Sequence, residues 1–261
     1  MLRTVKNLLF AIIEVQTIRS EKMIQGIVFD LDDTLYEQQS PFAEAIKSLF
    51  PSFPASKMND LFIRFRYYSD LHYMKSITGE WTLVKMRYER IRLALADFGY
   101  LPTDSEIHAF QENYDHALKN IALPYEITEA LDYLNQSETP IGLITNGPVE
   151  RQNDKIRALN IPRWIDQKHI LISDGVQIQK PDPGIFKLME AALNLSPESL
   201  LYVGDSFDND VLGAKAAGWS VWWFNHQRRE IPKNQLPIFE KELRSFNELS
   251  QALMNKKSLQ R

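Results

Sequence analysis

The stretch IQGIVFDLDDTLY, residues 24–36, decides the fold of this chain. Its first part, IQGIVF, is mainly apolar and partly β-branched, which is typical of a strand buried on both faces of a parallel sheet. The strand is expected to end at Asp30. In open α/β sheets, ligands bind in the crevice outside the carboxyl ends of the strands. We therefore predict that the Asp30 side chain lies in a functional site.

A second carboxylate, Asp32, follows two residues later. Two carboxylates this close push their pKa values apart, which suits one to stay ionised and the other to carry a proton. The pair thus favours Asp30 as a nucleophile and Asp32 as a general acid and base. An aspartate after a strand can also serve only to cap a turn, so this interpretation depends on the motifs that follow.

Another apolar strand, IGLITNG at residues 141–147, ends in a hydroxyl, an amide and a glycine. Pro148 comes next and favours the start of a helix, whose free N–H groups can face an anion. Thr145 can donate its hydroxyl to a phosphoryl oxygen, and Gly147 lets the backbone approach closely. Lys180, in QKPDPGIF, supplies positive charge for the phosphoryl oxygens in the transition state. The predicted phosphate-binding residues are Thr145, Asn146, Gly147 and Lys180.

A further apolar strand, SLLYVGD at residues 199–205, ends at Asp205, with Asp208 and Asp210 just beyond it. If Asp30 and Asp205 stand on neighbouring strands, they form an oxygen-rich pocket. The chain has no cysteine, and oxygen ligands suit a hard octahedral cation such as Mg²⁺. A metal would also reduce the repulsion between an attacking carboxylate and an anionic phosphate. The four segments together predict a magnesium-dependent site for phosphoryl transfer.

In their order and in their residues, these segments resemble the motifs of the haloacid dehalogenase superfamily. The matching motifs are DLDDT at 30–34, a strand ending in Thr145, then Lys180, and GDSFDND at 204–210. All four occur in the family's order, and the resemblance covers roughly residues 24 to 225. Each motif alone is weak evidence for the family, whereas the match of all four motifs together is specific.

The resemblance implies a chemical role for each matched residue. Asp30 would form an aspartyl-phosphate, and Asp32 would protonate the leaving group and then activate water. Thr145 and Lys180 would hold the phosphoryl group. Magnesium would be bound by the side chains of Asp30 and Asp205 and by the backbone carbonyl of Asp32. Asp210 would be an additional partner of the metal.

One residue separates phosphatases from dehalogenases in this family. Members that cleave carbon–halogen bonds lack an acid at the position that matches Asp32, because halide leaves without protonation. The resemblance therefore implies a phosphatase acting on a small phosphorylated metabolite of the nucleotide or sugar phosphate class. The alternatives are a phosphomutase of the same fold and a non-catalytic binding or regulatory member. A non-catalytic member would normally lack a nucleophile, an acid or a metal ligand, and none is missing here.

The long insert between the first two motifs has helical rather than strand patterns. Apolar residues recur at helical spacing over 58–77 and 81–100, and a third helix is expected over 104–120. The predicted fold class is α/β: a Rossmann-like parallel sheet flanked by helices, with an inserted α-helical cap domain that resembles the family's C1 cap. The expected domains are an N-terminal extension at 1–22, a catalytic core at 23–37 and 124–261, and the helical cap at 38–123.

The cap should select the substrate. A basic aromatic cluster that includes Arg64, Tyr67 and Tyr68 can stack against or bind a substrate group. Aromatic residues at this spacing more often form the core of a helix bundle, and the arginines between them more often a solvated face. These three residues are the specificity candidates that the sequence offers.

Composition narrows the choice of partners. The chain has 261 residues, 44% of them hydrophobic, which is enough for one α/β domain and a smaller accessory domain. Its net charge of −4 argues against a nucleic-acid partner. Residues 1–22 contain only a short apolar run, interrupted at Glu14, which argues against a membrane span. The expected partner is a small phosphorylated substrate, bound by a cytoplasmic monomer or homodimer.

Overall fold

The computed structural model describes residues 23–255, so the expected N-terminal extension at 1–22 lies outside the described residues. The chain forms two compact units. The first, called the core unit here, contains residues 23–35, 124–149 and 162–255. The second, the cap unit, contains residues 36–123 and 150–161.

The core unit is built on a six-stranded, all-parallel sheet with strand order β3-β2-β1-β4-β5-β6. This arrangement confirms the predicted Rossmann-like sheet. The chain passes from β1 outward to β3 and then crosses to β4, so the strand order reverses at β1. Such a reversal is where open α/β sheets bind their ligands. The strands are β1 (Gly26–Phe29), β2 (Ile141–Thr145), β3 (Ile170–Ile172), β4 (Leu200–Gly204), β5 (Ser220–Phe224) and β6 (Lys241–Leu243).

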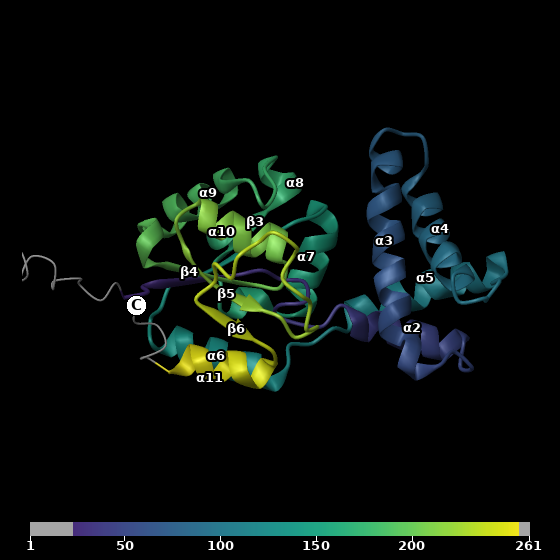
Figure 1. Cartoon of the computed structure of the whole chain (residues 1–261), viewed down its shortest axis with the longest axis horizontal. Helices are drawn as coiled ribbons and strands as arrows, with labels where there is room; N and C mark the ends of the chain where they lie inside the picture. Colours follow the sequence, from purple (N-terminus) through teal and green to yellow (C-terminus); the bar gives the residue numbers. More distant parts are fainter. Residues whose placement is uncertain (1–22, 256–261) are drawn as a thin grey trace, which may run out of the picture. The chain divides into compact units, whose positions relative to one another are not determined.

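Helices cover both faces of this sheet, which explains why every residue of β1, β2, β4 and β5 is buried. α6 (Tyr125–Gln136) and α11 (Phe246–Met254) lie side by side on one face, and α9 (Pro183–Leu193) and α10 (Leu212–Ala216) lie on the other (Figure 1). The tryptophans at 219 and 223 pack in the core with Phe186 and Tyr202.

The cap unit is helical. α3 pairs with α4, and α2 packs on α5 (Figure 1). Their shared core is aromatic, with the Phe42 ring centroid 4.8 Å from that of Phe65 and 5.7 Å from that of Phe110. The helices are α2 (Gln39–Leu49), α3 (Met58–Ile77), α4 (Leu83–Ala96), α5 (Asp104–Lys119) and, extending one residue beyond the unit, α7 (Val149–Ala158).

The cap helices begin where their capping residues predict. Thr82 accepts a hydrogen bond from the Lys85 amide at the start of α4. Thr103 and Glu106 form a reciprocal capping box at the start of α5, in which each side chain binds the other residue's backbone N–H. These contacts satisfy backbone donors that a helix terminus leaves open.

Short helical turns complete the chain. They are η1 (Ala55–Lys57), η2 (Ile161–Arg163), η3 (Gln167–His169), α8 (Ser173–Val176), η4 (Pro197–Ser199) and the π-helical turn η5 (Phe207–Val211). No helix within residues 23–255 is both long enough and apolar enough to cross a membrane.

Candidate active site

The pairing of β1 with β4 brings two of the predicted acidic residues together. Phe29 is in register with Val203, and the Asp30 amide donates to the Val203 carbonyl at 2.9 Å. Asp30 and Asp205 therefore leave adjacent strands at the same edge of the sheet. Carboxylate oxygens of Asp30, Asp205 and Asp210 all lie within 4.8 Å of one another.

Lys180 lies at the centre of this group and is 3% exposed. Its ammonium is 2.6 Å from Asp30 Oδ1 and 2.8 Å from Asp210 Oδ1. It also donates to the Tyr202 hydroxyl at 2.9 Å and to the Ile144 carbonyl at 3.1 Å. An ammonium has three N–H donors, and all three are engaged by protein oxygens. What Lys180 brings to the site is a fixed positive charge beside the expected nucleophile.

Asp210 reaches the site through the π-helical turn that follows β4. Ser206 caps this turn by accepting from the Asn209 amide at 3.2 Å, and the Ser206 amide donates to Asp210 Oδ2 at 2.9 Å. π-turns are rare and occur frequently at functional sites. Here the turn returns a residue five positions beyond Asp205 to the same pocket.

Gly204 leaves the space that the Asp210 side chain occupies. A Cβ atom added at Gly204 would lie 2.6 Å from Asp210 Cβ, with the Asp210 carboxylate close beside it. We expect Gly204→Ala to displace Asp210 and to lower the free energy of unfolding by about 1–3 kcal/mol, the usual cost of overpacking. Urea unfolding monitored by circular dichroism would measure this.

Gly175→Ala is the matched control, because the added methyl group would meet only Val149 Cγ2, at 3.4 Å. The packing argument for Gly204 would be wrong if both alanine variants unfolded at the same urea concentration.

The electrostatics of the site show an excess of negative charge. Burial raises the pKa of Asp30 to about 7; the charge of Lys180 opposes this, and the carboxylates of Asp210 and Asp32 add to it. Burial also raises the pKa of Asp205 well above its usual value, and Asp210 and Asp30 raise it further. Burial and the neighbouring carboxylates therefore outweigh the effect of the Lys180 charge on the pKa of Asp30.

The residues at the end of β2 form the second edge of the site. Thr145 is the buried last residue of β2, and Gly147 has a φ of 139°, which favours glycine. The Gly147 amide donates to Ser173 Oγ at 2.9 Å. Asn146 clamps the Lys180 backbone from both sides: its Nδ2 donates to the Lys180 carbonyl and its Oδ1 accepts from the Lys180 amide, each at 2.9 Å. Asn146 thus links the segment that contains Thr145 to the segment that presents Lys180.

Asp32 and Asp33 lie in the turn that follows β1. Asp32 is half-buried, and its charge contributes to the raised pKa of Asp30. Asp33 is buried and has a φ of 58°, in the left-handed region that aspartate tolerates better than most residues. The turn therefore separates the two side chains: Asp33 is enclosed, whereas Asp32 stays accessible.

Three residues that the sequence did not single out as functional also contact the site. The Tyr202 hydroxyl accepts from Lys180 and donates to the Ile144 carbonyl at 3.1 Å. Trp223 Nε1 donates to the Asp205 carbonyl at 2.8 Å, in addition to its role in packing. Arg229 Nη1 lies 2.9 Å from Asp205 Oδ2. Tyr202 had a detectable signal, because it carries the one hydroxyl within the otherwise apolar run LLYVG.

The cap residues proposed from sequence form a network of their own. Arg64 Nε pairs with Asp97, and its Nη2 donates to the Tyr68 hydroxyl at 3.0 Å. Its guanidinium carbon lies 4.7 Å from the Tyr67 ring centroid and 5.0 Å from that of Tyr68. Arg64 therefore already has a carboxylate partner, and its role in choosing a substrate stays a prediction.

The acidic group fits a divalent cation. Its donors are carboxylate oxygens, which Mg²⁺ prefers, and three carboxylates face two cationic side chains, Lys180 and Arg229. Asp210 Oδ1 is buried and accepts no hydrogen bond, although it lies close to the Lys180 ammonium. A bound cation would add positive charge beside Asp30 and Asp205, whose pKa values are raised by burial and by the neighbouring carboxylates.

The chain is similar in sequence to proteins that are named as phosphatases. It is 26% identical over 197 residues to glyceraldehyde 3-phosphate phosphatase of Methanopyrus kandleri, a match that covers 75% of this chain and 82% of that protein. It is 27% identical over 206 residues to phosphoglycolate phosphatase of Escherichia coli O157:H7, which covers 75% of this chain and 79% of that protein.

Solved structures share its fold. A HAD family hydrolase from Deinococcus radiodurans R1, with bound phosphate and sodium, matches with a TM-score of 0.65 at 18% identity, covering 91% of this chain and 98% of that one. The L-2-haloacid dehalogenase of Xanthobacter autotrophicus matches with a TM-score of 0.62 at 19% identity, covering 88% and 98%. The family model of the haloacid dehalogenase-like hydrolases matches residues 24–218. The chain therefore belongs to the haloacid dehalogenase-like hydrolase family.

Proposed function

We propose that this hydrolase is a magnesium-dependent phosphatase that acts on a small sugar-phosphate-class metabolite through an aspartyl-phosphate intermediate. The observation that carries the proposal is the group formed by Asp30, Asp205 and Asp210 around the Lys180 ammonium, at the carboxyl ends of adjacent parallel strands. A nucleophile, a fixed cation and a set of oxygen ligands are the parts that phosphoryl transfer to a carboxylate requires.

In the first half-reaction, an Asp30 carboxylate oxygen attacks the phosphorus atom of the ester. The P–O bond to the leaving group breaks as the new bond to Asp30 forms. Asp32 donates a proton to the leaving alkoxide, which departs as an alcohol. Thr145 and Lys180 stabilise charge on the phosphoryl oxygens, the lysine through its position beside Asp30.

In the second half-reaction, Asp32, now ionised, accepts a proton from a water molecule. The resulting hydroxide attacks the phosphorus atom and breaks its bond to Asp30, which releases inorganic phosphate and restores the carboxylate. The proton that Asp32 takes from water replaces the one that it gave to the leaving group, so the enzyme returns to its starting state. Splitting hydrolysis in this way replaces one difficult displacement with two easier ones.

The side chains of Asp30, Asp205 and Asp210 and the Asp32 carbonyl are the groups that would hold magnesium. When bound, the metal would neutralise negative charge on the nucleophile and the phosphate, so that the two anions can approach. Asp210 is held by the Ser206 amide and the Lys180 ammonium, which fixes its orientation before any cation binds.

The curated relatives support the proposed substrate class. Phosphatases for glyceraldehyde 3-phosphate and for phosphoglycolate both match this chain over 75% of its length. Both names describe two- or three-carbon phosphate monoesters. A compact phosphate monoester is therefore the first substrate to test, ahead of a nucleotide.

Metal removal should stop the reaction. We expect phosphate release from small phosphate monoesters and from p-nitrophenyl phosphate with magnesium present, and a loss of about 100-fold or more with excess chelator, because metal charge stabilisation supplies several kcal/mol. A colorimetric phosphate assay would measure both conditions. Addition of magnesium beyond the chelator should restore the rate, and an undiminished rate in chelator would contradict the metal-dependent mechanism.

A further inference from the structure

Arg229 is an exposed arginine that binds a largely buried residue of the site. It lies in the loop between β5 and β6, and its side chain is 45% exposed, whereas that of Asp205 is 14% exposed. Its Nη1 donates to Asp205 Oδ2 at 2.9 Å, and its Nη2 donates to Gln227 Oε1 at 2.8 Å. Both arms of the guanidinium are therefore held, and one of them is held by a proposed metal ligand.

The loop also fixes the backbone of Arg229. Asn225 is 3% exposed; its Oδ1 accepts from the Arg229 amide and its Nδ2 donates to the Arg229 carbonyl, each at 2.8 Å. Nδ2 also donates to Glu242 Oε1 at 2.8 Å, and the Asn225 amide donates to the Leu243 carbonyl at 2.7 Å. Glu242 and Leu243 belong to β6. Arg229 is thus presented to Asp205 from a loop that is tied to the sheet.

The other cation of the site is held in the same way. Asn146 binds the amide and the carbonyl of Lys180, each at 2.9 Å. Lys180 contacts two of the three carboxylates in the acidic group, and Arg229 contacts the third. Each carboxylate is therefore paired with a cation whose backbone is fixed by an asparagine side chain. This parallel favours a role for Arg229 in the site over that of an ordinary surface ion pair.

Asp205 is held at two points and has one carboxylate oxygen outside these contacts. Its backbone carbonyl accepts from Trp223 Nε1 at 2.8 Å, and its Oδ2 accepts from Arg229. Within residues 23–255, no hydrogen bond reaches its Oδ1. Carboxylates that bind metals are usually hydrogen-bonded in turn, which fixes their orientation. The contacts of Asp205 match this pattern.

We propose that Arg229 is a positioning residue for the proposed magnesium site. By binding Oδ2, it holds the Asp205 carboxylate so that Oδ1 can coordinate the cation. Arg229 acts through Asp205 and thereby sets the affinity of the site for the metal. The inference rests on the proposed function, because it takes Asp205 as a magnesium ligand.

The charge of Arg229 alone would have the opposite effect on metal affinity. A cation beside the site repels Mg²⁺, so its removal would tighten binding. Arg229 is 45% exposed, however, and exposed charge pairs change an equilibrium constant by about five-fold at most. Loss of an outer partner of a metal ligand usually weakens binding by about 10- to 100-fold. The loss of orientation should therefore outweigh the loss of repulsion, and the sign of the change separates positioning from competition.

Binding of Mn²⁺ to the full-length protein tests this proposal without turnover. Mn²⁺ prefers the same oxygen ligands as Mg²⁺, and the free ion can be counted by electron paramagnetic resonance. We expect Arg229→Met to raise the Kd for Mn²⁺ by about 10-fold or more. Arg229→Lys keeps the charge but loses the two-armed contact, so its Kd should lie between those of the wild type and Arg229→Met. An unchanged or lower Kd in Arg229→Met would overturn the proposal.

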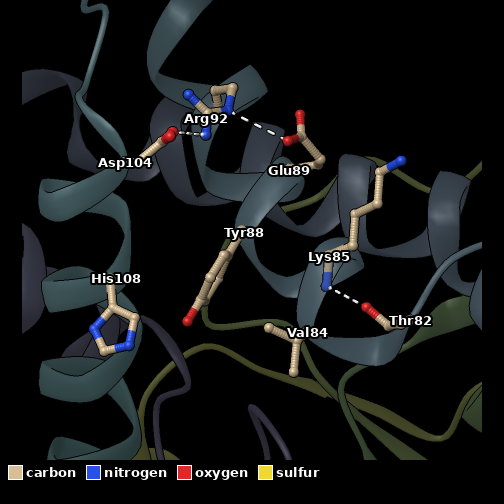
Figure 2. Close-up of a pocket in the computed structure, with 8 residues that line it drawn as sticks. All are labelled: Thr82, Val84, Lys85, Tyr88, Glu89, Arg92, Asp104 and His108. Carbon is tan, nitrogen blue, oxygen red and sulfur yellow. Dashed lines mark hydrogen bonds and ion pairs between the residues drawn. The ribbon is translucent and has the colours of Figure 1, made fainter.

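Two other arginines provide matched controls. The Arg228 side chain forms no ion pair or hydrogen bond within residues 23–255, so Arg228→Met removes only a charge from the same loop. Arg92, in the cap unit, pairs through Nη2 with Asp104 at 2.7 Å and through Nε with Glu89 at 3.3 Å. Figure 2 shows both pairs at the edge of a cavity of about 450 Å³ between α4 and α5. Neither Arg228→Met nor Arg92→Met should raise the Kd for Mn²⁺.

The magnesium dependence of phosphate release distinguishes positioning from a general loss of structure. In Arg229→Met, the magnesium concentration that gives half the maximal rate should rise by about the same factor as the Kd for Mn²⁺. Excess magnesium should then recover part of the lost rate. A rate that is low at every magnesium concentration, with an unchanged Kd, would refute the positioning role. Urea unfolding in chelator would check that the variant is folded.

The outcomes separate this inference from the proposed function. If the wild type binds Mn²⁺ but cleaves no phosphate ester, the phosphatase function fails, and the Kd values still decide the role of Arg229. If the wild type cleaves esters with magnesium and Arg229→Met binds Mn²⁺ as tightly as the wild type, the positioning role fails and the phosphatase function stands. A wild type that does not bind Mn²⁺ at all would contradict both.

Discussion

Replacing Asp30 with Asn should abolish phosphate release and leave the fold intact. The amide cannot act as the attacking carboxylate, so no aspartyl-phosphate can form, and loss of a covalent nucleophile typically lowers kcat by about 10⁴-fold or more. The substitution is close to isosteric, and Lys180 keeps its second carboxylate, Asp210. Initial rates of phosphate release with saturating magnesium, together with a far-ultraviolet circular dichroism spectrum, would test both parts.

The control for Asp30→Asn is Asp208→Asn. Asp208 is an exposed aspartate in the same segment as Asp205 and Asp210, so the control makes the same chemical change without altering the proposed nucleophile. We expect this control to turn over at a rate close to that of the wild type. Substantial phosphatase activity in Asp30→Asn would refute Asp30 as the nucleophile.

Replacing Lys180 with Met should have the largest effect on stability and also remove activity. The substitution keeps a long side chain but leaves Asp30 and Asp210 buried without their shared cation. Breaking a buried ion pair by removing one partner costs about 3–5 kcal/mol, because the remaining charge is uncompensated. Equilibrium urea unfolding in the presence of chelator would measure the loss of unfolding free energy.

Lys168→Met provides the comparison for a lysine at the surface. Lys168 lies 3.5 Å from Asp166, and its side chain is 68% exposed. Exposed ion pairs contribute at most about 1 kcal/mol, so this variant should unfold at nearly the wild-type urea concentration. If Lys180→Met is equally mild, Lys180 does not compensate the buried carboxylates in the way proposed here.

The sheet and the acidic edge of the site could be predicted because both depend on local patterns. A buried strand of a parallel sheet is a short apolar run, and a polar residue directly after it must lie at the carboxyl edge. The sequence alone therefore predicts that Asp30, Thr145 and Asp205 lie at that edge. The helices at 58–77 and 104–119 were predictable for a similar reason, since their apolar residues recur at helical spacing.

Contacts between residues far apart in the sequence could not be predicted in this way. Arg229 lies in a loop after β5 and pairs with Asp205, 24 residues earlier. No periodicity marks such a loop residue, and the contact depends on how the loop returns over the sheet. The hydrogen bonds between Asn146 and the Lys180 backbone join residues 34 positions apart, and no sequence pattern indicates them either.

The buried position of Arg90 has a local signal in the sequence. It lies four residues after Met86 and four before Ala94, and both of these neighbours are buried. Residues four apart share one face of a helix, so this arginine occupies a core position.

Because of the π-helical turn at Phe207–Val211, the position of Asp210 depends more on the number of residues in this turn than on the identity of most of its side chains. Asp210 meets the site because the turn is wider than an α-helical one. Deleting one residue would advance an α-helical position by about 100° and turn the carboxylate away. Exposed Asp208 can vary in chemistry, but the number of residues between Asp205 and Asp210 cannot change without moving a proposed metal ligand. Within this family, insertions and deletions here should therefore be rarer than substitutions, and transplanting the site to another sheet would require the whole segment.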